Sequence, residues 1–393
     1  MAFLKDVSLS AIIAGFVTVL VGFTSSAVIV FQAAQALGAS SAEIASWMWA
    51  LGLGMGLTCI VLSLRYRVPV VTAWSTPGAA MLITSAEGVS MPEAIAAFVV
   101  CGVLMALCGF TGWFERAMNR IPISIASGML AGVLLRFGLD VFTAMQTQFV
   151  MVFAMFCTYL VLRRTLPCYA TVAALVLGII IASIQGLLQM DSIQWSLAMP
   201  VFTRPQFSVR SLMGVALPLF AVTMASQNVP GVAVIRASGY SVPISPLIGW
   251  TGTTTVLLAP FGGFAYNLAA ITAAICMGRE AHEDPDRRYV AAIAAGVFYL
   301  IVGIFGAAVT SVFAAFPPEL VLAIAGLALL GTIGNGLAAA LRHETEREPA
   351  LITFLVTASG ATLFGIGSAF WGLIAGALAI AILQIKQPSI NRT

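Results

Sequence analysis

The chain contains 393 residues, of which 60% are hydrophobic and only 8% carry a charged side chain, and its mean hydropathy is +1.03. This composition excludes a soluble globular domain and is typical of a protein that crosses the lipid bilayer many times. The formal net charge of +3 gives no indication of a nucleic-acid partner, and the positions of the charges are more informative than their sum.

Fourteen apolar segments are predicted to cross the membrane, so the fold class is an all-α polytopic membrane protein. In chain order they cover approximately residues 9–36, 42–63, 70–86, 92–114, 121–139, 145–162, 168–188, 211–235, 243–258, 259–277, 289–312, 318–341, 349–365 and 367–385. A strict count that lost the two interrupted segments, the third and the tenth, would give twelve. The first span is expected to be retained, because no small-residue cleavage site follows it as in a signal peptide.

The third segment, Val70–Ala86, is interrupted at its centre by Ser75-Thr76-Pro77-Gly78. Pro77 has no backbone donor and its ring disfavours helical geometry at Thr76, so we predict an extended approach as far as Ser75. A half-helix then begins near the centre of the bilayer, capped by Ser75 or Thr76, with Pro77 in its first turn. The unpaired N–H groups at such a helix start attract anions, which makes this a candidate substrate site.

The tenth segment lies within Leu257–Met277 and is interrupted by a proline and two glycines, Pro260, Gly262 and Gly263. It is predicted to resume as a helix with Asn267 as its N-cap. Two broken apolar segments, one in each half of a chain, indicate the binding site of a transporter. The alternative is a pair of ordinary membrane helices kinked by proline.

The basic residues follow the positive-inside rule if the N-terminus lies in the cytoplasm and the fourteen segments alternate in direction. Fifteen of the 18 lysines and arginines then lie on the cytoplasmic side, and only Arg136, Arg204 and Arg210 lie outside. This asymmetry predicts an even number of spans with both termini in the cytoplasm. The cytoplasmic stretch Arg279–Arg288 mixes acidic and basic residues and is expected to be a solvated connection.

The longest outside connection, approximately Gln189–Arg210, divides the chain into two sets of seven spans. Because seven is odd, the second set must have inverted topology, so we predict a first repeat over 1–188 and an inverted second repeat over 211–393. A faint internal echo supports this division. The first and eighth spans each carry a polar cluster at mid-span, Thr24-Ser25-Ser26 and Ser226-Gln227-Asn228.

Four stretches of sequence carry a resemblance to a known family. They are VGFTSSAVIVFQAA in the first span, AWSTPGAAMLITSA in the third, MASQNVPGVAVI in the eighth and PFGGFAYNLAAITAAICMG in the tenth. Together they resemble the bacterial benzoate–proton symporter (BenE) family over essentially the whole chain. The chain is more distantly similar to the uracil and xanthine permeases and to the sulfate-type anion transporters.

The resemblance implies that a core domain carries substrate against a gate domain by alternating access, with the third and tenth spans beside the substrate. The core domain would cover approximately 9–114 plus 211–312, and the gate domain approximately 121–188 plus 318–385. The resemblance also implies a location in the bacterial inner membrane and uptake of a small aromatic carboxylate with protons. Relatives of the fold often form homodimers through the gate domain.

One departure from the nucleobase permeases bears on the substrate. Those permeases hold their substrate with carboxylates on the eighth and tenth spans, whereas this chain has the neutral amides of Gln227, Asn228 and Asn267 there. A carboxylate would repel an anionic substrate, whereas amides and helix N-termini would attract one. The departure therefore favours benzoate over a nucleobase.

Benzoate requires a donor-rich place for its carboxylate and a flat apolar slot for its ring. The candidate substrate-binding residues are Ser25, Ser26, Thr76, Pro77, Gly78, Ala79, Gln227, Asn228, Phe264, Tyr266, Asn267 and Leu268. Several have an alternative role: the serines would mediate helix contacts, the amides would form a polar network, and Phe264, like Phe23, would pack the core.

No carboxylate lies centrally in the predicted core spans, so the sequence assigns no proton-coupling residue. Asp140 follows Arg136 by four residues and is expected to form a local ion pair with it. Neither histidine lies within a span and the six cysteines form no CxxC pair, so no metal, no cofactor and no enzymatic chemistry is expected.

The leading function is therefore a proton-coupled importer of benzoate or a close aromatic carboxylate. One alternative is the same fold transporting another small anion or a nucleobase. The other is an anion channel, which would conduct without saturation and without dependence on protons.

Overall fold

The computed structural model describes residues 6–85, 89–166, 169–188, 197–306, 316–361, 363 and 368–383. In the first half, the elements are α2 (Leu9–Ala36), α3 (Ser41–Tyr66), β1 (Thr72–Ala73), α4 (Thr76–Ser85), α5 (Met91–Phe110), α6 (Trp113–Met118), α7 (Ile123–Ala144), α8 (Phe149–Thr165) and α9 (Ala170–Ile184). In the second half, they are α10 (Val209–Ser211), η2 (Leu212–Ala216), α11 (Leu217–Thr223), η3 (Met224–Asn228), α12 (Val229–Ala237), α13 (Ile244–Leu258), η4 (Ala259–Phe261), β2 (Asn267–Leu268), α14 (Ile271–Met277), η5 (Pro285–Arg287), α15 (Tyr289–Phe305), α17 (Pro318–Ala340), α18 (Glu344–Ala358) and α19 (Ser368–Leu383).

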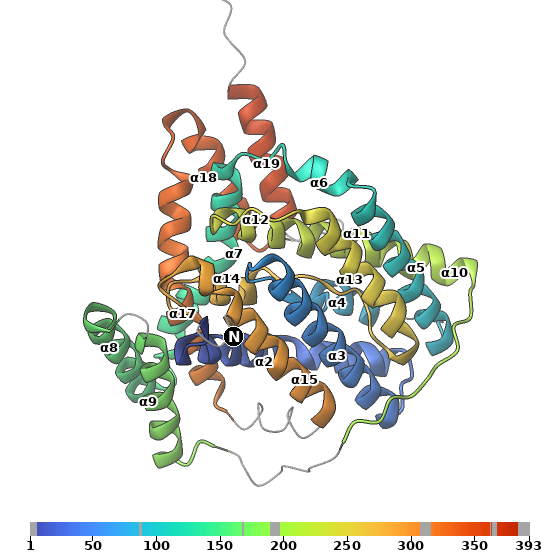
Figure 1. The fold of residues 1–393 in the computed structure, drawn as a ribbon, viewed down its shortest axis with the longest axis horizontal. Coiled ribbons are helices and arrows are strands. Elements are labelled where there is room, and N and C mark those ends of the chain that lie inside the picture. The colour runs from blue at the N-terminus through green and yellow to red at the C-terminus, as the bar shows by residue number, and fades with distance from the viewer. Residues whose placement is uncertain are drawn as a thin grey trace, which may run out of the picture.

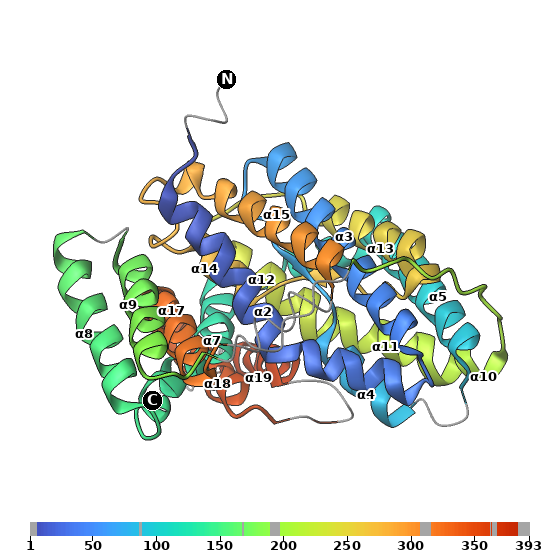
Figure 2. The ribbon, with the colours of Figure 1, turned by 90° about the horizontal axis from the view of Figure 1, so that it is seen from below.

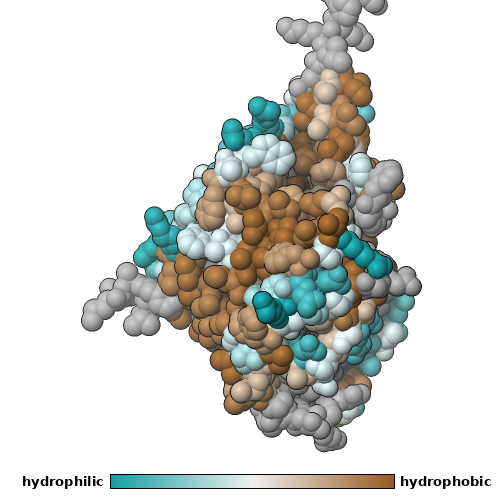
Figure 3. Space-filling view, turned by 90° about the vertical axis from the view of Figure 1, so that its right-hand side faces the viewer, coloured by the Kyte–Doolittle hydropathy of each residue, from teal (hydrophilic) through white to brown (hydrophobic). Residues whose placement is uncertain are grey.

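Six helical stretches of the described chain are long and apolar enough to cross a membrane. They are Ser41–Tyr66, Met91–Phe110, Ile123–Ala144, Val209–Ala237, Pro285–Phe305 and Pro318–Ala340. Figure 3 shows a broad hydrophobic surface on the side that lies to the right in Figure 1, as expected of helices that face lipid. The count of fourteen spans and the inverted repeat stay predictions.

Helix starts follow capping signals that are visible in the sequence. Ser40 and Glu43 form a capping box at the start of α3, and Ser90 and Glu93 form another at the start of α5. Ser8 caps α2, because its Oγ accepts a hydrogen bond of 3.2 Å from the backbone N of Ala11. In α2 and α3 the serine hydroxyl satisfies an N–H group that would otherwise lack a partner at the helix start. In α5 the carboxylate of Glu93 accepts a hydrogen bond from the backbone N of Ser90.

Glycines allow two pairs of helices to pack with their backbones in contact. A Cβ added at Gly52 of α3 would lie 2.5 Å from the Cα of Gly303 in α15, and one added at Gly109 of α5 would lie 2.3 Å from the N of Gly249 in α13. Such close approach is typical of helix contacts in membranes, where small residues replace a hydrophobic driving force. The glycine-rich run around Gly52 is therefore a helix contact.

Gly52→Ala is expected to lower the melting temperature of the detergent-solubilised protein, because the added methyl group would force α3 and α15 apart. The matched control is Gly214→Ala, since a Cβ at Gly214 meets no atom within 4 Å. The control should leave the melting temperature unchanged or raise it, because alanine favours helix. Equal melting temperatures for the two variants would contradict the proposed close contact.

The helix contacts divide into two groups. In one group α3 packs on α15, α5 on α13, and α2 on α4, α14 and α15; in the other, α7 packs on α17 and α18, α8 on α9, and α18 on α19. Figures 1 and 2 both place α8 and α9 at one end and α5 and α10 at the other. Contacts of α12 with α7 and of α2 with α17 join the two groups.

The two broken segments meet through a short antiparallel ladder. Thr72 pairs with Leu268 and Ala73 with Asn267, so β1 and β2 cross the interior side by side. The half-helix α4 begins at Thr76, and the Oγ of Ser75 accepts a hydrogen bond of 3.1 Å from the N of Gly78. The predicted extended segment, half-helix and serine cap of the third segment are therefore all present.

The predicted N-cap of the second half-helix is wrong. Asn267 belongs to β2, and α14 begins only at Ile271, after Ala270. The physical reason is the ladder, because the chain at Asn267 is held extended by its pairing with Ala73. A polar residue followed by a helical pattern predicts a cap only where no other segment pairs with its backbone.

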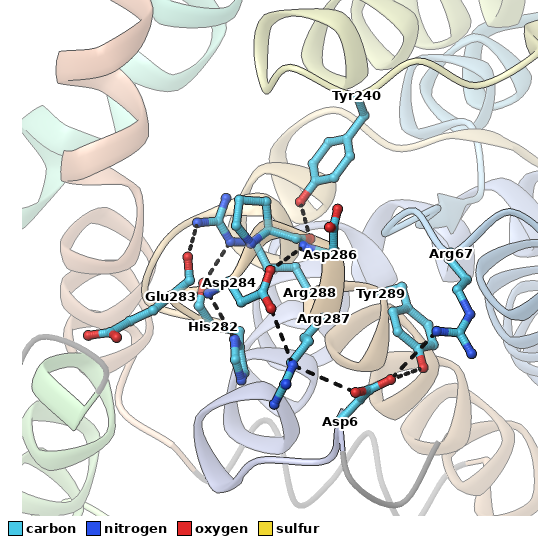
Figure 4. Close-up of polar contacts among 11 residues, drawn as sticks. Asp6, Arg67, Tyr240, His282, Glu283, Asp284, Asp286, Arg287, Arg288 and Tyr289 are labelled. Atoms are coloured by element: carbon cyan, nitrogen blue, oxygen red, sulfur yellow. Dashed lines mark hydrogen bonds and ion pairs between the residues drawn. The ribbon is translucent and has the colours of Figure 1, made fainter. Parts of the chain in front are cut away.

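Polar side chains gather on the face that carries the beginning of α2 (Figure 4). The carboxylate of Asp6 lies 3.9 Å from Arg67 and 3.7 Å from Arg287, and it accepts a hydrogen bond of 2.8 Å from the hydroxyl of Tyr289. These contacts bring the N-terminal segment, the end of α3 and the start of α15 to one face. The positive-inside pattern predicts this grouping.

The connection Arg279–Arg288 is not simply solvated, which corrects the sequence-based expectation. Arg288 is only 7% exposed and Glu280 only 8%. Arg288 donates hydrogen bonds to the carbonyl oxygens of Met277 (2.9 Å), His282 (2.7 Å) and Glu283 (3.2 Å). A buried guanidinium needs several acceptors, and this loop supplies them from its own backbone.

Candidate functional site

A cavity of about 350 Å³ lies between the two broken segments. Its size is within the range of small-molecule sites. The walls come from α2, α3, β1, α4, α7, η3, α14, α15 and the residues that precede the two half-helices. The lining residues are Val21, Gly22, Ser26, Met55, Ala73, Trp74, Thr76, Pro77, Phe137, Gln227, Ala269, Ala270, Ile271, Thr272 and Tyr299.

The lining is neutral, because none of these residues carries a charge at neutral pH. Its side-chain donors are the hydroxyls of Ser26, Thr76, Thr272 and Tyr299 and the amide of Gln227. An anion in this cavity would meet neutral donors and no carboxylate. A cation, by contrast, would find no charged partner on the walls.

The aromatic part of the wall consists of Trp74, Phe137 and Tyr299. Trp74 is held in place by a hydrogen bond of 3.1 Å from its Nε1 to the Oγ of Ser26. The ring of Phe23 supports it from behind, edge to face, with centroids 4.9 Å apart and planes at 79°. These contacts fix a flat apolar surface beside the polar groups.

The start of α4 is fixed by neighbouring residues of α11. The hydroxyl of Thr223 donates a hydrogen bond of 2.9 Å to the Oγ of Ser75, which itself caps α4. A Cβ at Gly78 would lie 2.6 Å from Leu219, so Gly78 faces α11 and is not in the cavity lining. Of the predicted residues in this half-helix, Thr76 and Pro77 line the cavity, whereas Gly78 and the buried Ala79 do not.

The adjacent amides of η3 have different environments. Gln227 lines the cavity, whereas Asn228 is fully buried outside the lining. The Oδ1 of Asn228 accepts a hydrogen bond of 2.9 Å from the backbone N of Leu268, and its Nδ2 lies 3.2 Å from the Sδ of Met224. Asn228 therefore braces β2. Both amides lie in a π-helical turn, and such turns are frequent at functional sites.

Asn228→Leu is expected to lower the free energy of unfolding by about 1–3 kcal/mol, because the N–H of Leu268 would be left buried without a partner. The measurement is the thermal melting of the purified protein. Gln227→Leu is the matched control and should change the melting temperature little, because Gln227 is only partly buried at the cavity wall. Similar losses in both variants would contradict the bracing role of Asn228.

Three predicted residues of the tenth segment lie outside the cavity lining. Phe264 packs in a buried cluster with Trp47 and Phe98, with centroids 5.6 and 5.5 Å away. The hydroxyl of Tyr266 donates a hydrogen bond of 2.6 Å to the carbonyl of Ala50. The Nδ2 of Asn267 donates one of 3.0 Å to the carbonyl of Ala265. In this conformation none of the three is positioned to touch a molecule in the cavity.

The remaining predicted residues also divide into those that line the cavity and those that do not. Ser26 lines the cavity, and Leu268 is buried in β2 beside it. The side chain of Ser25 lies outside the described residues, although its place in α2 is described. The structure thus brings together Ser26, Thr76, Pro77 and Gln227 from three separate spans.

Sequence reasoning missed the other lining residues, whose aromatic and polar members are Trp74, Phe137, Thr272 and Tyr299. Trp74 immediately precedes the Ser75 cap, so its position in the broken segment was a usable signal. Phe137 and Tyr299 come from α7 and α15 and carry no local pattern. The ion pair predicted between Arg136 and Asp140 is not among the ion pairs of the described residues.

Comparison with protein-family models matches residues 5–382 to the family described as "Benzoate membrane transport protein" (BenE). The chain is 50% identical over 374 residues to "Inner membrane protein YdcO" of Escherichia coli (strain K12), covering 95% of this chain and 96% of that protein. It is 42% identical over 379 residues to "Benzoate membrane transport protein" of Acinetobacter baylyi (strain ATCC 33305 / BD413 / ADP1), covering 96% of each.

Among solved structures, the fold is similar to that of SLC26A9, with a TM-score of 0.51 and 10% identity over 96% of this chain and 65% of that one. The transmembrane domain of the cyanobacterial bicarbonate transporter BicA matches with a TM-score of 0.47 and 14% identity, covering 94% of this chain and 97% of that one. At 10% identity, the similarity to SLC26A9 concerns the fold alone.

The family match spans nearly the whole chain, and the two relatives match 95% and 96% of it. The apolar helices of the structure agree with a place in the membrane. The chain belongs to the benzoate membrane transport protein family, whose members are membrane transport proteins and not enzymes.

Proposed function

We propose that this protein imports benzoate or a closely related aromatic carboxylate together with protons, by alternating access across the bacterial inner membrane. The observation that carries the proposal is the composition of the central cavity. Trp74, Phe137 and Tyr299 offer aromatic surface, while Gln227 and Thr272 offer neutral donors, and no carboxylate is present to repel an anion.

The carboxylate of the substrate would lie near the start of α4. Thr76 begins this ten-residue helix and also lines the cavity, so the positive end of the helix is directed towards it. Gln227 approaches from η3 and adds an amide donor. The ring would then lie against Trp74, whose orientation is already fixed by Ser26.

Movement of a core domain against a gate domain would give access to each side in turn. Phe137 of α7 is the residue that the proposed gate contributes to the cavity. Two inverted repeats, 1–188 and 211–393, would relate α3 to α13 and α5 to α15. The packing of α3 on α15 and of α5 on α13, together with the antiparallel pairing of β1 and β2, supports that symmetry. An even number of spans would place both termini on the same side, and the positive-inside rule would make that side the cytoplasm.

The test is uptake of radiolabelled benzoate into proteoliposomes, with and without an inward proton gradient. We expect saturable uptake that the gradient stimulates and that unlabelled benzoate inhibits, whereas uracil and sulfate do not. Inhibition by sulfate or uracil would assign the site to another substrate. Uptake that neither saturates nor responds to the gradient would indicate a channel.

A further inference from the structure

An ion pair between a buried carboxylate and an arginine whose side chain is 40% exposed joins the two groups of helices. Glu280 follows the half-helix α14, and its side chain is only 8% exposed. Its Oε1 lies 2.6 Å from the Nη1 of Arg163, in the last turn of α8. Burial of a carboxylate is costly unless a cation and hydrogen bonds compensate it, so this pair calls for a functional explanation.

The arginine is held by its own helix. Arg163 donates a hydrogen bond to the hydroxyl of Tyr159, one helical turn earlier in α8, and its guanidinium lies 5.5 Å from the centroid of that ring. Tyr159 is 1% exposed. Tyr159 and Arg163 belong to the same helix, so this support of the arginine does not depend on Glu280.

The glutamate is fixed to the half-helix that borders the cavity. Arg288 donates to the carbonyl oxygen of Met277, at the end of α14. It also donates to those of His282 and Glu283 in the following loop (Figure 4). Glu280 lies within this braced loop. At its other end α14 presents Thr272 to the cavity. A displacement of α14 is therefore expected to carry Glu280 with it.

The surroundings of the pair come from both groups of helices. A small space of about 130 Å³ is lined by Ser238, Arg279, Glu280 and Arg288 on one side and by Arg163, Gly331 and Asn335 on the other. A Cβ at Gly331 would lie 2.8 Å from the Nη2 of Arg163 and 2.9 Å from the Oε1 of Glu280. Only the absence of a side chain on α17 at this point leaves room for the pair.

We infer that Glu280 and Arg163 form a latch between the core and gate domains, and that each transport cycle must break it. This inference rests on the proposed alternating-access function. Both are positioning residues, because neither lines the central cavity. They act through α14, so that breaking the Glu280–Arg163 contact and moving the cavity wall at Thr272 occur together.

The test measures how fast a cysteine at position 238 reacts with a maleimide in the detergent-solubilised full-length protein. The parent carries Ser238→Cys, and its six native cysteines are replaced by alanine. Because the wall at Ser238 faces residues of both groups, opening of the latch should expose it. We expect Glu280→Gln to raise the labelling rate at least about fivefold over the parent. The charge-swapped pair Glu280→Arg with Arg163→Glu should return it to within about twofold of the parent.

Tyr159→Phe is a milder variant that keeps the ring and the fold and removes only the hydroxyl that positions Arg163. It should also raise the labelling rate, but by less than Glu280→Gln does. Glu319→Gln is the matched control, because Glu319 accepts a hydrogen bond of 3.0 Å from Thr147 within the proposed gate domain. It should leave the rate unchanged.

An unchanged labelling rate in Glu280→Gln, or a charge swap that fails to restore it, would overturn the latch. The labelling needs no substrate, so this outcome is separate from a failure of the transport proposal. If labelling responds as expected but proteoliposomes take up no benzoate, the latch stands and the substrate assignment falls.

Discussion

Trp74→Leu is expected to weaken benzoate binding at least about tenfold. The substitution keeps an apolar side chain at the cavity wall but removes the aromatic face, which contributes roughly 0.5–1.5 kcal/mol beyond area burial. It also removes the indole donor to Ser26 that fixes the wall in place. The loss of contact area adds to this effect, since each buried methylene-sized group contributes about 0.8 kcal/mol.

The measurement is equilibrium binding of radiolabelled benzoate to the purified protein, accompanied by a melting curve. Trp47→Leu is the matched control, because Trp47 and Trp74 are 2% and 4% exposed and the same atoms are removed. Trp47 packs on Phe98 and Phe264, away from the cavity. It should lower the melting temperature and leave the affinity of the folded protein nearly unchanged. Equal losses of affinity would mean that Trp74 acts through stability alone.

Gln227→Glu is expected to reduce benzoate uptake at neutral pH by about a hundredfold or more. The two side chains have nearly the same shape, so the change is one of charge. Two like charges about 4 Å apart repel by roughly 4 kcal/mol at an effective dielectric constant of ~20, and ~1.4 kcal/mol corresponds to a factor of ten. No cation in the cavity lining offsets that repulsion.

Initial rates of uptake into proteoliposomes measure the effect. Gln146→Glu is the matched control, because Gln146 is exposed in the connection between α7 and α8, and it should transport as the parent does. Gln227→Ala removes the amide donor without adding a charge. It should lower the initial rate of uptake less than tenfold, as expected for the loss of one neutral hydrogen bond. If Gln227→Glu transports benzoate normally, the carboxylate binds elsewhere than the Gln227 wall.

The sequence by itself determined the class of protein, the family and the interruption of the third apolar segment. Hydropathy identified a membrane protein, and the interruption around Pro77 predicted an extended segment, a cap at Ser75 and the start of α4. These features depend on forces that act within a few residues: burial in lipid, a missing backbone donor and a helix cap. For this reason they could be predicted without a partner segment.

Only the tertiary structure decided which side chains of those segments face the cavity. Asn267 was predicted to cap a helix, but the pairing of β2 with β1 holds it in a strand. The neighbouring amides of η3 looked equivalent, but the N–H of Leu268 binds Asn228 and leaves Gln227 at the wall. In each case the deciding partner is distant in the sequence.

The same reason explains the residues that the sequence did not single out. Phe137 and Tyr299 reach the cavity from other helices, and nothing in their local sequence separates them from packing residues. The connection Arg279–Arg288 was predicted to be solvated because many of its residues are charged. Its burial depends on Arg163 of α8, more than a hundred residues earlier, and on the backbone oxygens that Arg288 gathers. Contacts between remote segments carry no local signal, so only the folded chain could place these side chains.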